Sequence, residues 1–271
     1  MPLLKSVELP TGVVLPYVEQ GDASGVPVVL LHGVTDSWRS FEPLLAHLPP
    51  FLHAFAVTQR GHGEASQPQI GYRTRDFAAD IAAFIDALGL EAPIVVGHSM
   101  GSVNATRFAI DHPEALRALV LIGAFATFRN KPGIVEFCRS SLAPLRDPID
   151  PVFAREFQES TLANPVAPEF LEMVVGESLK VPAHVWRGAF AGFLEDDFAG
   201  ELDEIRAPTW LVWGDRDTFS SRADQDTLLA KIPGARLSVY EGVGHALHWE
   251  APRRVAVELS VFVSSIEAQS R

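Results

Sequence analysis

Cysteine, long apolar runs and positive charge are all scarce in this sequence of 271 residues. The single cysteine, Cys138, excludes an internal disulfide. It has no base-like residue near it in the sequence, so we expect a bystander thiol rather than a nucleophile. No stretch reaches the ~18 uninterrupted apolar residues of a membrane span, and Met1–Pro10 lack the apolar segment of a signal peptide. We therefore expect a soluble cytoplasmic protein that does not bind membranes.

Basic residues are too few to balance the acidic ones. The 22 Lys and Arg residues stand against 34 Asp and Glu, which gives a formal net charge of −12. This excess repels polyanions at long range, so it argues against nucleic acids and anionic membranes as partners. The sequence also lacks an H-E-x-x-H run, paired Cys/His spacing, a G-x-G-x-x-G motif and a P-loop. We therefore predict no metal and no cofactor.

What the sequence does contain is an alternation of short apolar runs and helical patterns. Runs rich in Val, Ile and Leu fit strands that are covered on both faces. The predicted strands are Val26–Leu31, Ala54–Thr58, Pro93–Val96, Leu119–Ile122, Thr209–Trp213 and Arg236–Tyr240, with Val13–Val18 as an antiparallel edge. The predicted helices are Asp76–Leu88 with Gly89 as its cap, a segment around Leu44, Leu45 and Leu48, and Pro252–Ile266. This alternation predicts an α/β fold with a doubly wound, mostly parallel sheet.

One region interrupts the alternation. From about Thr127 to Leu202 there is no strand-like run, only helical patterns separated by Pro and Gly. We interpret this segment as a helical cap, inserted after the sixth strand and lying over the sheet. The chain is then divided into a core of residues 1–126 and 203–271 and a cap of residues 127–202.

The clearest chemical motif is Gly97-His98-Ser99-Met100-Gly101, a G-x-S-x-G sequence between an apolar strand and a helical pattern. A serine on a sharp strand-to-helix turn has a strained backbone, and side chains two positions away on either side collide with the neighbouring strand and helix. This explains both glycines. The turn exposes the serine hydroxyl, so the motif predicts that Ser99 is a nucleophile.

A serine nucleophile needs a base and a group that orients the base. Downstream, Trp213-Gly214-Asp215-Arg216-Asp217 follows one predicted strand, and Gly242-Val243-Gly244-His245 follows the last. The carboxyl ends of parallel strands are where such sheets assemble their active sites. The order serine, acid, histidine is the one expected when the elbow belongs to an α/β sheet. His245 is the predicted base, and Asp215 and Asp217 are the two candidate acids.

Five motifs together resemble the α/β-hydrolase superfamily over nearly the whole chain. They are Leu31-His32-Gly33-Val34, Arg60-Gly61-His62-Gly63, the elbow at Ser99, WGDRD at 213–217 and GVGHALHWEAP at 242–252. The resemblance implies a Ser99–His245–Asp217 triad, because in similar proteins the acid lies three residues after the glycine. Asp215 is then a turn residue. The backbone N–H groups of Val34 and Met100 are the implied oxyanion hole.

The remaining histidines have structural interpretations. We expect His32 to order the oxyanion loop, His62 to do the same in the Arg60–Gly63 turn, and His98 to point away from the catalytic centre. We expect His248 near the start of the last helix. Six apolar side chains are candidates to contact substrate, although each also fits an ordinary core position: Phe125, Phe128, Trp186, Phe190, Phe219 and Leu247.

The predicted function is hydrolysis of a carboxylic ester or lactone with an apolar moiety, through an acyl-enzyme intermediate. Serine at position 99 disfavours the dehalogenase and epoxide-hydrolase branches, whose elbows carry aspartate. Three alternatives stay open: a carbon–carbon bond hydrolase of ring-cleavage products, a cofactor-free perhydrolase, and a hydrolase-like small-molecule receptor. The partner is a small molecule, and the sequence allows either a monomer or a homodimer.

Overall fold

The computed structural model describes residues 3–128 and 131–269. Its centre is one eight-stranded sheet in the order β1-β2-β4-β3-β5-β6-β7-β8. The pairs β1–β2 and β2–β4 are antiparallel, and all other neighbours are parallel. The strands are β1 Leu4–Glu8, β2 Val14–Gln20, β3 Val26–Leu31, β4 Leu52–Val57, β5 Ile94–His98, β6 Ala118–Ile122, β7 Thr209–Gly214 and β8 Arg236–Tyr240. The predicted doubly wound, mostly parallel sheet is confirmed.

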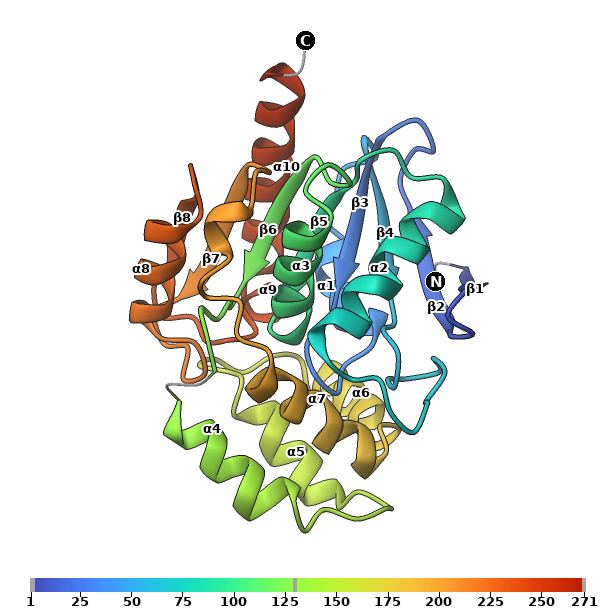
Figure 1. The fold of residues 1–271 in the computed structure, drawn as a ribbon, viewed down its shortest axis with the longest axis vertical. Helices are drawn as coiled ribbons and strands as arrows, with labels where there is room; N and C mark the ends of the chain where they lie inside the picture. Colours follow the sequence, from blue (N-terminus) through green and yellow to red (C-terminus); the bar gives the residue numbers. More distant parts are fainter. Residues whose placement is uncertain (1–2, 129–130, 270–271) are drawn as a thin grey trace.

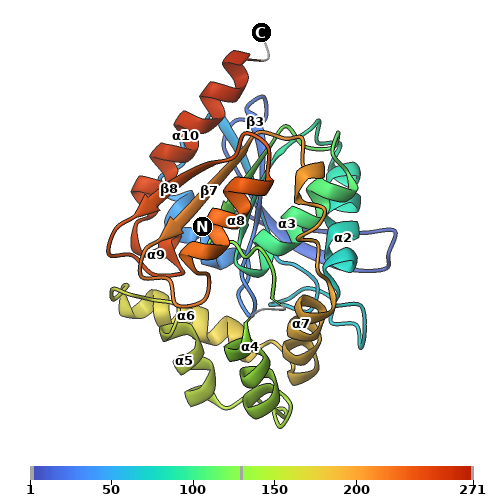
Figure 2. The ribbon, with the colours of Figure 1, turned by 60° about the vertical axis from the view of Figure 1, so that its left-hand side comes forward.

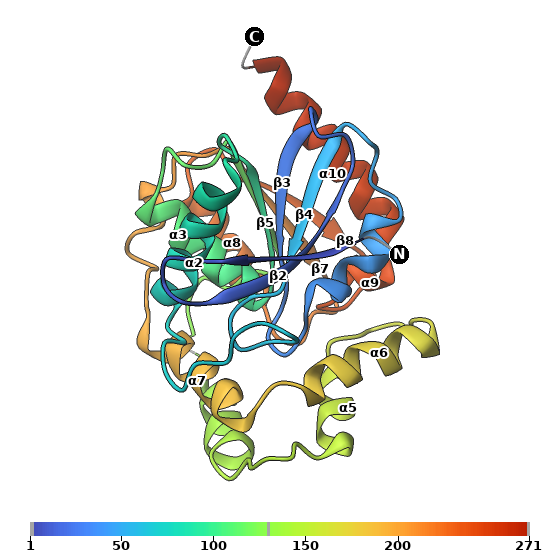
Figure 3. The ribbon, with the colours of Figure 1, turned by 90° about the vertical axis from the view of Figure 1, so that its right-hand side faces the viewer.

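Helices cover both faces of this sheet (Figures 1 and 3). Successive strand residues point to opposite faces, so in β3 Val29 and Leu31 pack on one side while Val28 and Leu30 pack on the other. The first side is covered by α2 Thr74–Leu88, α3 Met100–Asp111 and α8 Arg222–Lys231. The second is covered by α1 Glu42–Leu45, α9 Leu247–Glu250 and α10 Pro252–Gln269.

Two sequence predictions about these elements need correction. β2 is antiparallel as expected, but β1 pairs outside it and forms the edge of the sheet. β1 carries mostly exposed residues on both faces, so it has no apolar pattern to reveal it. Helix α1 ends at Leu45 and does not reach Leu48, which directly precedes Pro49 and Pro50.

Between β6 and β7 the described residues form helices without any strand. Apart from the short η3 Leu202–Glu204 close to β7, these are α4 Pro132–Phe137, η2 Cys138–Leu142, α5 Pro151–Glu159, α6 Pro168–Leu179 and α7 Ala183–Glu195. Three of them begin at a proline, which lacks the N–H that a first helical turn leaves unpaired. They lie together beyond the carboxyl ends of the strands (Figures 1 and 2). We call these helices the cap; the predicted bounds 127–202 include residues 129 and 130, which lie outside the described residues.

The structure also bears on the single cysteine and on the predicted absence of a membrane span. Cys138 is half-buried in the cap, and burial raises the pKa of its thiol, which disfavours the reactive thiolate. In the described part of the chain, no helix combines the length and the apolar character that crossing a bilayer requires. Met1 and Pro2, part of the segment considered for a signal peptide, lie outside the described residues.

Candidate active site

Ser99 lies at the turn between β5 and α3, with backbone angles φ 52° and ψ −116°. A positive φ is uncommon for a residue with a side chain and costs free energy. Packing explains why the two flanking glycines are needed. A Cβ atom on Gly97 would lie 2.2 Å from the carbonyl oxygen of Gly101, and one on Gly101 would lie 2.1 Å from that of Leu31. The backbones therefore approach too closely for any other residue, and the turn presents Ser99, which remains partly exposed.

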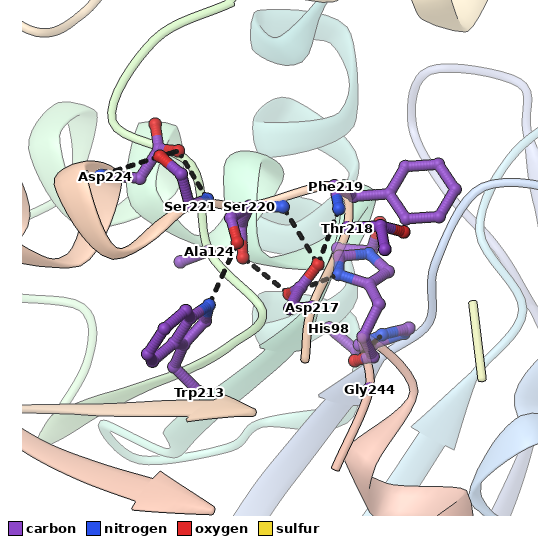
Figure 4. A network of polar contacts seen from close by, with 12 residues as sticks. His98, Ala124, Trp213, Asp217, Thr218, Phe219, Ser220, Ser221, Asp224 and Gly244 are labelled. Carbon is purple, nitrogen blue, oxygen red and sulfur yellow. Dashed lines mark hydrogen bonds and ion pairs between the residues drawn. The ribbon is translucent and has the colours of Figure 1, made fainter. Parts of the chain in front are cut away.

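Asp217 and His245 come together from the loops that follow β7 and β8. Nδ1 of His245 donates a hydrogen bond to Oδ2 of Asp217 at 2.8 Å. The carboxylate also accepts bonds from the backbone N–H groups of Phe219 at 2.7 Å and Ser220 at 2.9 Å, and from the Ser220 hydroxyl at 2.6 Å (Figure 4). Its side chain is fully buried. Four hydrogen bonds thus fix the carboxylate against one edge of the imidazole.

The electrostatics of this pair favour an ionised Asp217. Burial raises the pKa of its carboxyl, but the imidazole of His245 and the hydrogen bonds from His245 and Ser220 outweigh burial and hold the pKa below its ordinary value of 3.8. A permanently charged carboxylate at this position orients the imidazole and stabilises its cation. Asp215 has a different place: it is exposed, and its Oδ1 accepts the N–H of Gly242 at 2.6 Å.

The other edge of the imidazole is unpaired, and His245 lines a cavity together with Ser99. Nε2 of His245 is buried and has no hydrogen-bond partner among the described residues. Ser99, Val34, Met100 and His245 line one cavity of about 30 Å³. Within the described residues, the backbone N–H groups of Val34 and Met100 donate to no protein acceptor. The cavity therefore brings together a hydroxyl, an unpaired imidazole nitrogen and two unpaired N–H donors. These are the kinds of group that an acyl-transfer reaction requires.

The neighbouring histidines support the loops around this cavity. His32 contacts the carbonyl of Gly33 through Nδ1 at 2.7 Å and accepts the N–H of Gln59 through Nε2 at 2.9 Å. Nδ1 of His62 lies 2.8 Å from the carbonyl of Arg60, within its own turn. His98 was expected to point away from the catalytic centre, but it lines the cavity, with its ring centroid 5.0 Å from that of His245. His98 and His248 are buried with ring centroids 4.3 Å apart. Burial lowers the pKa of both rings, and that of His248 falls to about 3, so both are neutral at neutral pH.

Four of the six predicted substrate contacts, Phe125, Phe128, Phe190 and Phe219, line the cavity. The other two do not, which corrects the prediction. Trp186 is fully buried inside the cap, where it packs against Phe157 with ring centroids 5.0 Å apart. Leu247 is only two residues from His245, but its side chain belongs to the core between the sheet and helices α1 and α10.

A larger groove of about 590 Å³ lies next to the cavity, at the surface of the cap. Four side chains line both spaces: Ile134, Phe157, Phe190 and Phe219. The ring centroid of Phe219 lies 4.9 Å from that of His245, so the boundary between the two spaces lies beside the imidazole. We call the small space the inner cavity and the large one the outer groove.

Several residues that line the inner cavity were not predicted from the sequence, among them Asp36, Gln158 and Trp249. Asp36 follows the implied oxyanion residue Val34 by two positions, at the carboxyl end of β3, and this position was a usable signal. Gln158 has no such signal, because it belongs to cap helix α5 and no pattern in the sequence tells which face of that helix meets the cavity. Among residues 3–128 and 131–269, no three His, Cys, Asp or Glu side chains are grouped closely enough to hold a metal ion.

Comparison with known proteins identifies the family. Residues 26–252 match the family model described as the alpha/beta hydrolase fold. Because this range covers most of the chain, the protein belongs to the α/β-hydrolase family.

Its relatives carry several activities. The chain is 27% identical over 270 residues to the non-heme chloroperoxidase of Streptomyces lividans, covering 92% of this chain and 95% of that one. A shorter match, 39% identical over 99 residues, is to the 2-(acetamidomethylene)succinate hydrolase of Mesorhizobium japonicum and spans 36% of each chain. Among solved structures, esterase RhEst1 from Rhodococcus sp. ECU1013 superimposes with a TM-score of 0.82 at 26% identity, covering 97% of this chain and 99% of that one.

Proposed function

We propose that the protein is a serine hydrolase that cleaves a carboxylic ester or lactone with an apolar moiety. The observation that carries the proposal is the inner cavity, in which Ser99 on its strained turn meets His245, whose far edge is bonded to Asp217. A hydroxyl becomes a nucleophile only when a base accepts its proton, and Nε2 of His245 is the free base in this cavity.

The proposed reaction proceeds in two halves. Oγ of Ser99 attacks the carbonyl carbon while Nε2 of His245 takes the hydroxyl proton, and Asp217 stabilises the imidazolium. The N–H groups of Val34 and Met100 hold the negative oxygen. His245 then protonates the leaving alcohol, the carbon–oxygen bond breaks, and an acyl-Ser99 ester remains. Water repeats the sequence: it gives its proton to His245 and its hydroxide to the carbonyl carbon, and the acid leaves as Ser99 recovers its proton.

The walls of the cavity and groove support an apolar substrate moiety. Six of the residues that line the inner cavity are phenylalanines, and the outer groove lies beside Phe219, next to the imidazole of His245 that would protonate the leaving group. We infer that an apolar alcohol portion occupies the outer groove. Apolar surface buried there contributes about 25 cal/mol per Å² to binding.

Removal of the serine hydroxyl tests the proposal. The Ser99→Ala variant is expected to lose at least about 10³-fold in kcat on short-chain 4-nitrophenyl esters, because the nucleophile acts as a unit with its base. A fluorophosphonate probe is expected to label the wild type at Ser99 and to leave the variant unlabelled. Hydrolysis by Ser99→Ala at the wild-type rate contradicts the proposal.

A perhydrolase is the second candidate, because the relative matched over 92% of this chain is a non-heme chloroperoxidase. In this reaction hydrogen peroxide replaces water in the second half, and the acyl group leaves as a peracid. The two candidates share the acyl-enzyme and differ in the second nucleophile. Assay of peracid formation from an acetate ester with hydrogen peroxide distinguishes them, and a peracid yield no greater than that of Ser99→Ala excludes the second.

A further inference from the structure

The inner cavity has one polar corner that the proposed reaction does not use. Asp36, from the loop after β3, and Gln158, from cap helix α5, both line this cavity together with Ser99. Their exposed fractions are only 3% and 1%. A buried carboxyl is costly unless it is fully paired, so its presence in a largely apolar wall needs an explanation.

The amide of Gln158 is held by acceptors on one side only. Its Nε2 donates to Oδ1 of Asp36 at 2.9 Å and to Oγ of Ser178 at 2.8 Å, and lies 3.2 Å from Oγ1 of Thr35. Ser178 in turn donates to the carbonyl of Val174, which leaves its oxygen free to accept from the amide. These contacts fix the orientation of the amide. Its Oε1 is buried and has no hydrogen-bond partner among the described residues.

The Asp36 carboxyl accepts one hydrogen bond from the cap and one from its own loop, the latter from the backbone N–H of Gly33. The hydrogen bond that its carboxyl accepts from a side chain is the one from Gln158. Burial raises the pKa of the Asp36 carboxyl to about 7; the bond from Gln158 and the nearby His245 lower it, and Glu177 raises it further. The corner thus presents the carboxylate oxygens of Asp36 and the unpaired Oε1 of Gln158, next to the loop that carries the proposed oxyanion residue Val34.

We propose that Asp36, oriented by Gln158, is a specificity residue that accepts a hydrogen bond from a hydroxyl or ammonium group on a short acyl chain. The inference rests on the proposed function, since the acyl group exists only if Ser99 is acylated. The leaving group extends past Phe219 to the outer groove, so the acyl group remains in the inner cavity. At about 30 Å³ that cavity admits only a small group, which brings its substituents against Asp36.

The alternative is a purely structural role. Thr35 and Asp36 belong to the core, whereas Gln158 and Ser178 belong to cap helices α5 and α6, so the same network also fastens the cap to the core. A fastening role affects all substrates equally. A specificity role affects only substrates that carry the donor, and the ratio of two substrates measured on one preparation separates the two roles.

The experiment compares phenyl 2-hydroxypropanoate and phenyl 2-aminopropanoate with phenyl propanoate at pH 8, where Asp36 is ionised. For the wild type we expect kcat/KM to be at least about tenfold higher for the hydroxy or the amino ester than for propanoate, after correction for uncatalysed hydrolysis. Preference for the amino ester alone identifies an ammonium ligand, and equal preference identifies a general donor. A ratio of one or less for both esters overturns the proposal without any variant.

Two variants locate the preference. Asp36→Asn keeps the size of the side chain but replaces one acceptor oxygen with a donor, and the ratio is expected to fall to about one. Ser178→Ala breaks the same network behind Gln158 without lining the cavity, so it is the matched control and is expected to keep the wild-type ratio. A preference that persists in Asp36→Asn overturns the assignment. A preference lost equally in both variants overturns the assignment to Asp36, because the network as a whole and not its carboxylate then determines the ratio.

Failure of this inference is distinct from failure of the proposed function. If wild-type protein hydrolyses all three esters at similar rates and Ser99→Ala hydrolyses none, the proposed serine hydrolase function is supported and the proposed role of Asp36 is refuted. If Ser99→Ala is as active as the wild type, the proposed function falls, and the subsite falls with it.

Discussion

Oδ2 of Asp217 lies 2.8 Å from Nδ1 of His245, while Asp215, two residues earlier in the same loop, bonds the N–H of Gly242 at 2.6 Å. Two carboxylates that are equally good candidates in the sequence therefore have different partners: Asp217 bonds the imidazole, and Asp215 bonds a loop N–H group. Asp217 is fully buried against the imidazole, and Asp215 is exposed and joins the loop after β7 to the one after β8. The difference has a direct kinetic consequence.

The Asp217→Asn variant is expected to lose about 10³–10⁴-fold in kcat on a short-chain ester, because an amide stabilises neither the required tautomer nor the imidazolium. Asp215→Asn is the matched control, and its loss is expected to stay below about tenfold, since it removes one exposed contact of a loop. Steady-state kinetics on both purified variants provide the measurement. Equal losses, or a larger loss in Asp215→Asn, refute the assignment of the acid.

The parts of the site that could be predicted from sequence are those fixed by the chain's own geometry. The apolar run of β5, the two glycines and the helical pattern after them determine the turn at Ser99, because no other residue fits 2.2 Å from the backbone at position 97. The strand ends likewise determine which loops meet, so Asp217 and His245 were found together with Ser99. These inferences need only periodicity and close backbone approach.

The parts that failed depend on contacts between distant segments. Leu247 follows His245 closely, yet it packs on the other side of the sheet, because the chain turns into α9 there. Trp186 lies in the cap, and nothing in its own sequence tells whether it faces the cavity or the cap interior. Gln158 was missed for the same reason. A helical pattern gives the apolar stripe of a cap helix, but the angle at which that helix docks decides which residues reach the substrate.

The turn at Ser99 approaches β3 so closely that replacing its glycine with alanine is expected to destabilise the protein, whereas the same replacement in a cap helix is not. Gly101→Ala places a Cβ atom 2.1 Å from the carbonyl oxygen of Leu31, and is expected to cost about 3 kcal/mol or more in the free energy of unfolding, or to give insoluble protein. Gly176→Ala in α6 meets nothing within 4 Å and is expected to gain about 0.5–1 kcal/mol. Urea unfolding measures both changes. Wild-type stability in Gly101→Ala contradicts the packing argument.

The small volume of the inner cavity, set against that of the neighbouring outer groove, predicts a preference for short acyl chains. The inner cavity is about 30 Å³ and the groove about 590 Å³, so in the wild type kcat/KM is expected to fall from 4-nitrophenyl acetate to the octanoate. Phe190 lines both spaces, and Phe190→Ala is expected to raise the octanoate-to-acetate ratio at least about tenfold. Phe137 lines only the groove, so Phe137→Ala serves as the control with an unchanged ratio. An unchanged ratio in Phe190→Ala shows that this ring does not limit the length of the acyl chain.

The buried carboxyl of Asp36 predicts a pH-dependent cost to stability. Its pKa is about 7 in the folded protein against an ordinary value of 3.8, so between these values the folded state binds more protons than the unfolded state. Its contribution to the free energy of unfolding therefore decreases as pH rises through this window. From pH 5 to pH 8 the change is roughly 2–3 kcal/mol, because each tenfold change in a proton-binding equilibrium corresponds to about 1.4 kcal/mol.

Asp36→Asn lacks this titration, so its free energy of unfolding is expected to rise relative to that of the wild type by the same amount from pH 5 to pH 8. Urea unfolding of both proteins at half-unit steps of pH measures the difference, in which the titrations common to both cancel. Parallel curves would mean that Asp36 ionises normally and is not buried in the folded protein. A variant that is more stable at pH 8 yet loses discrimination between hydroxy and plain acyl esters shows that the carboxyl is kept for substrate recognition at the expense of stability.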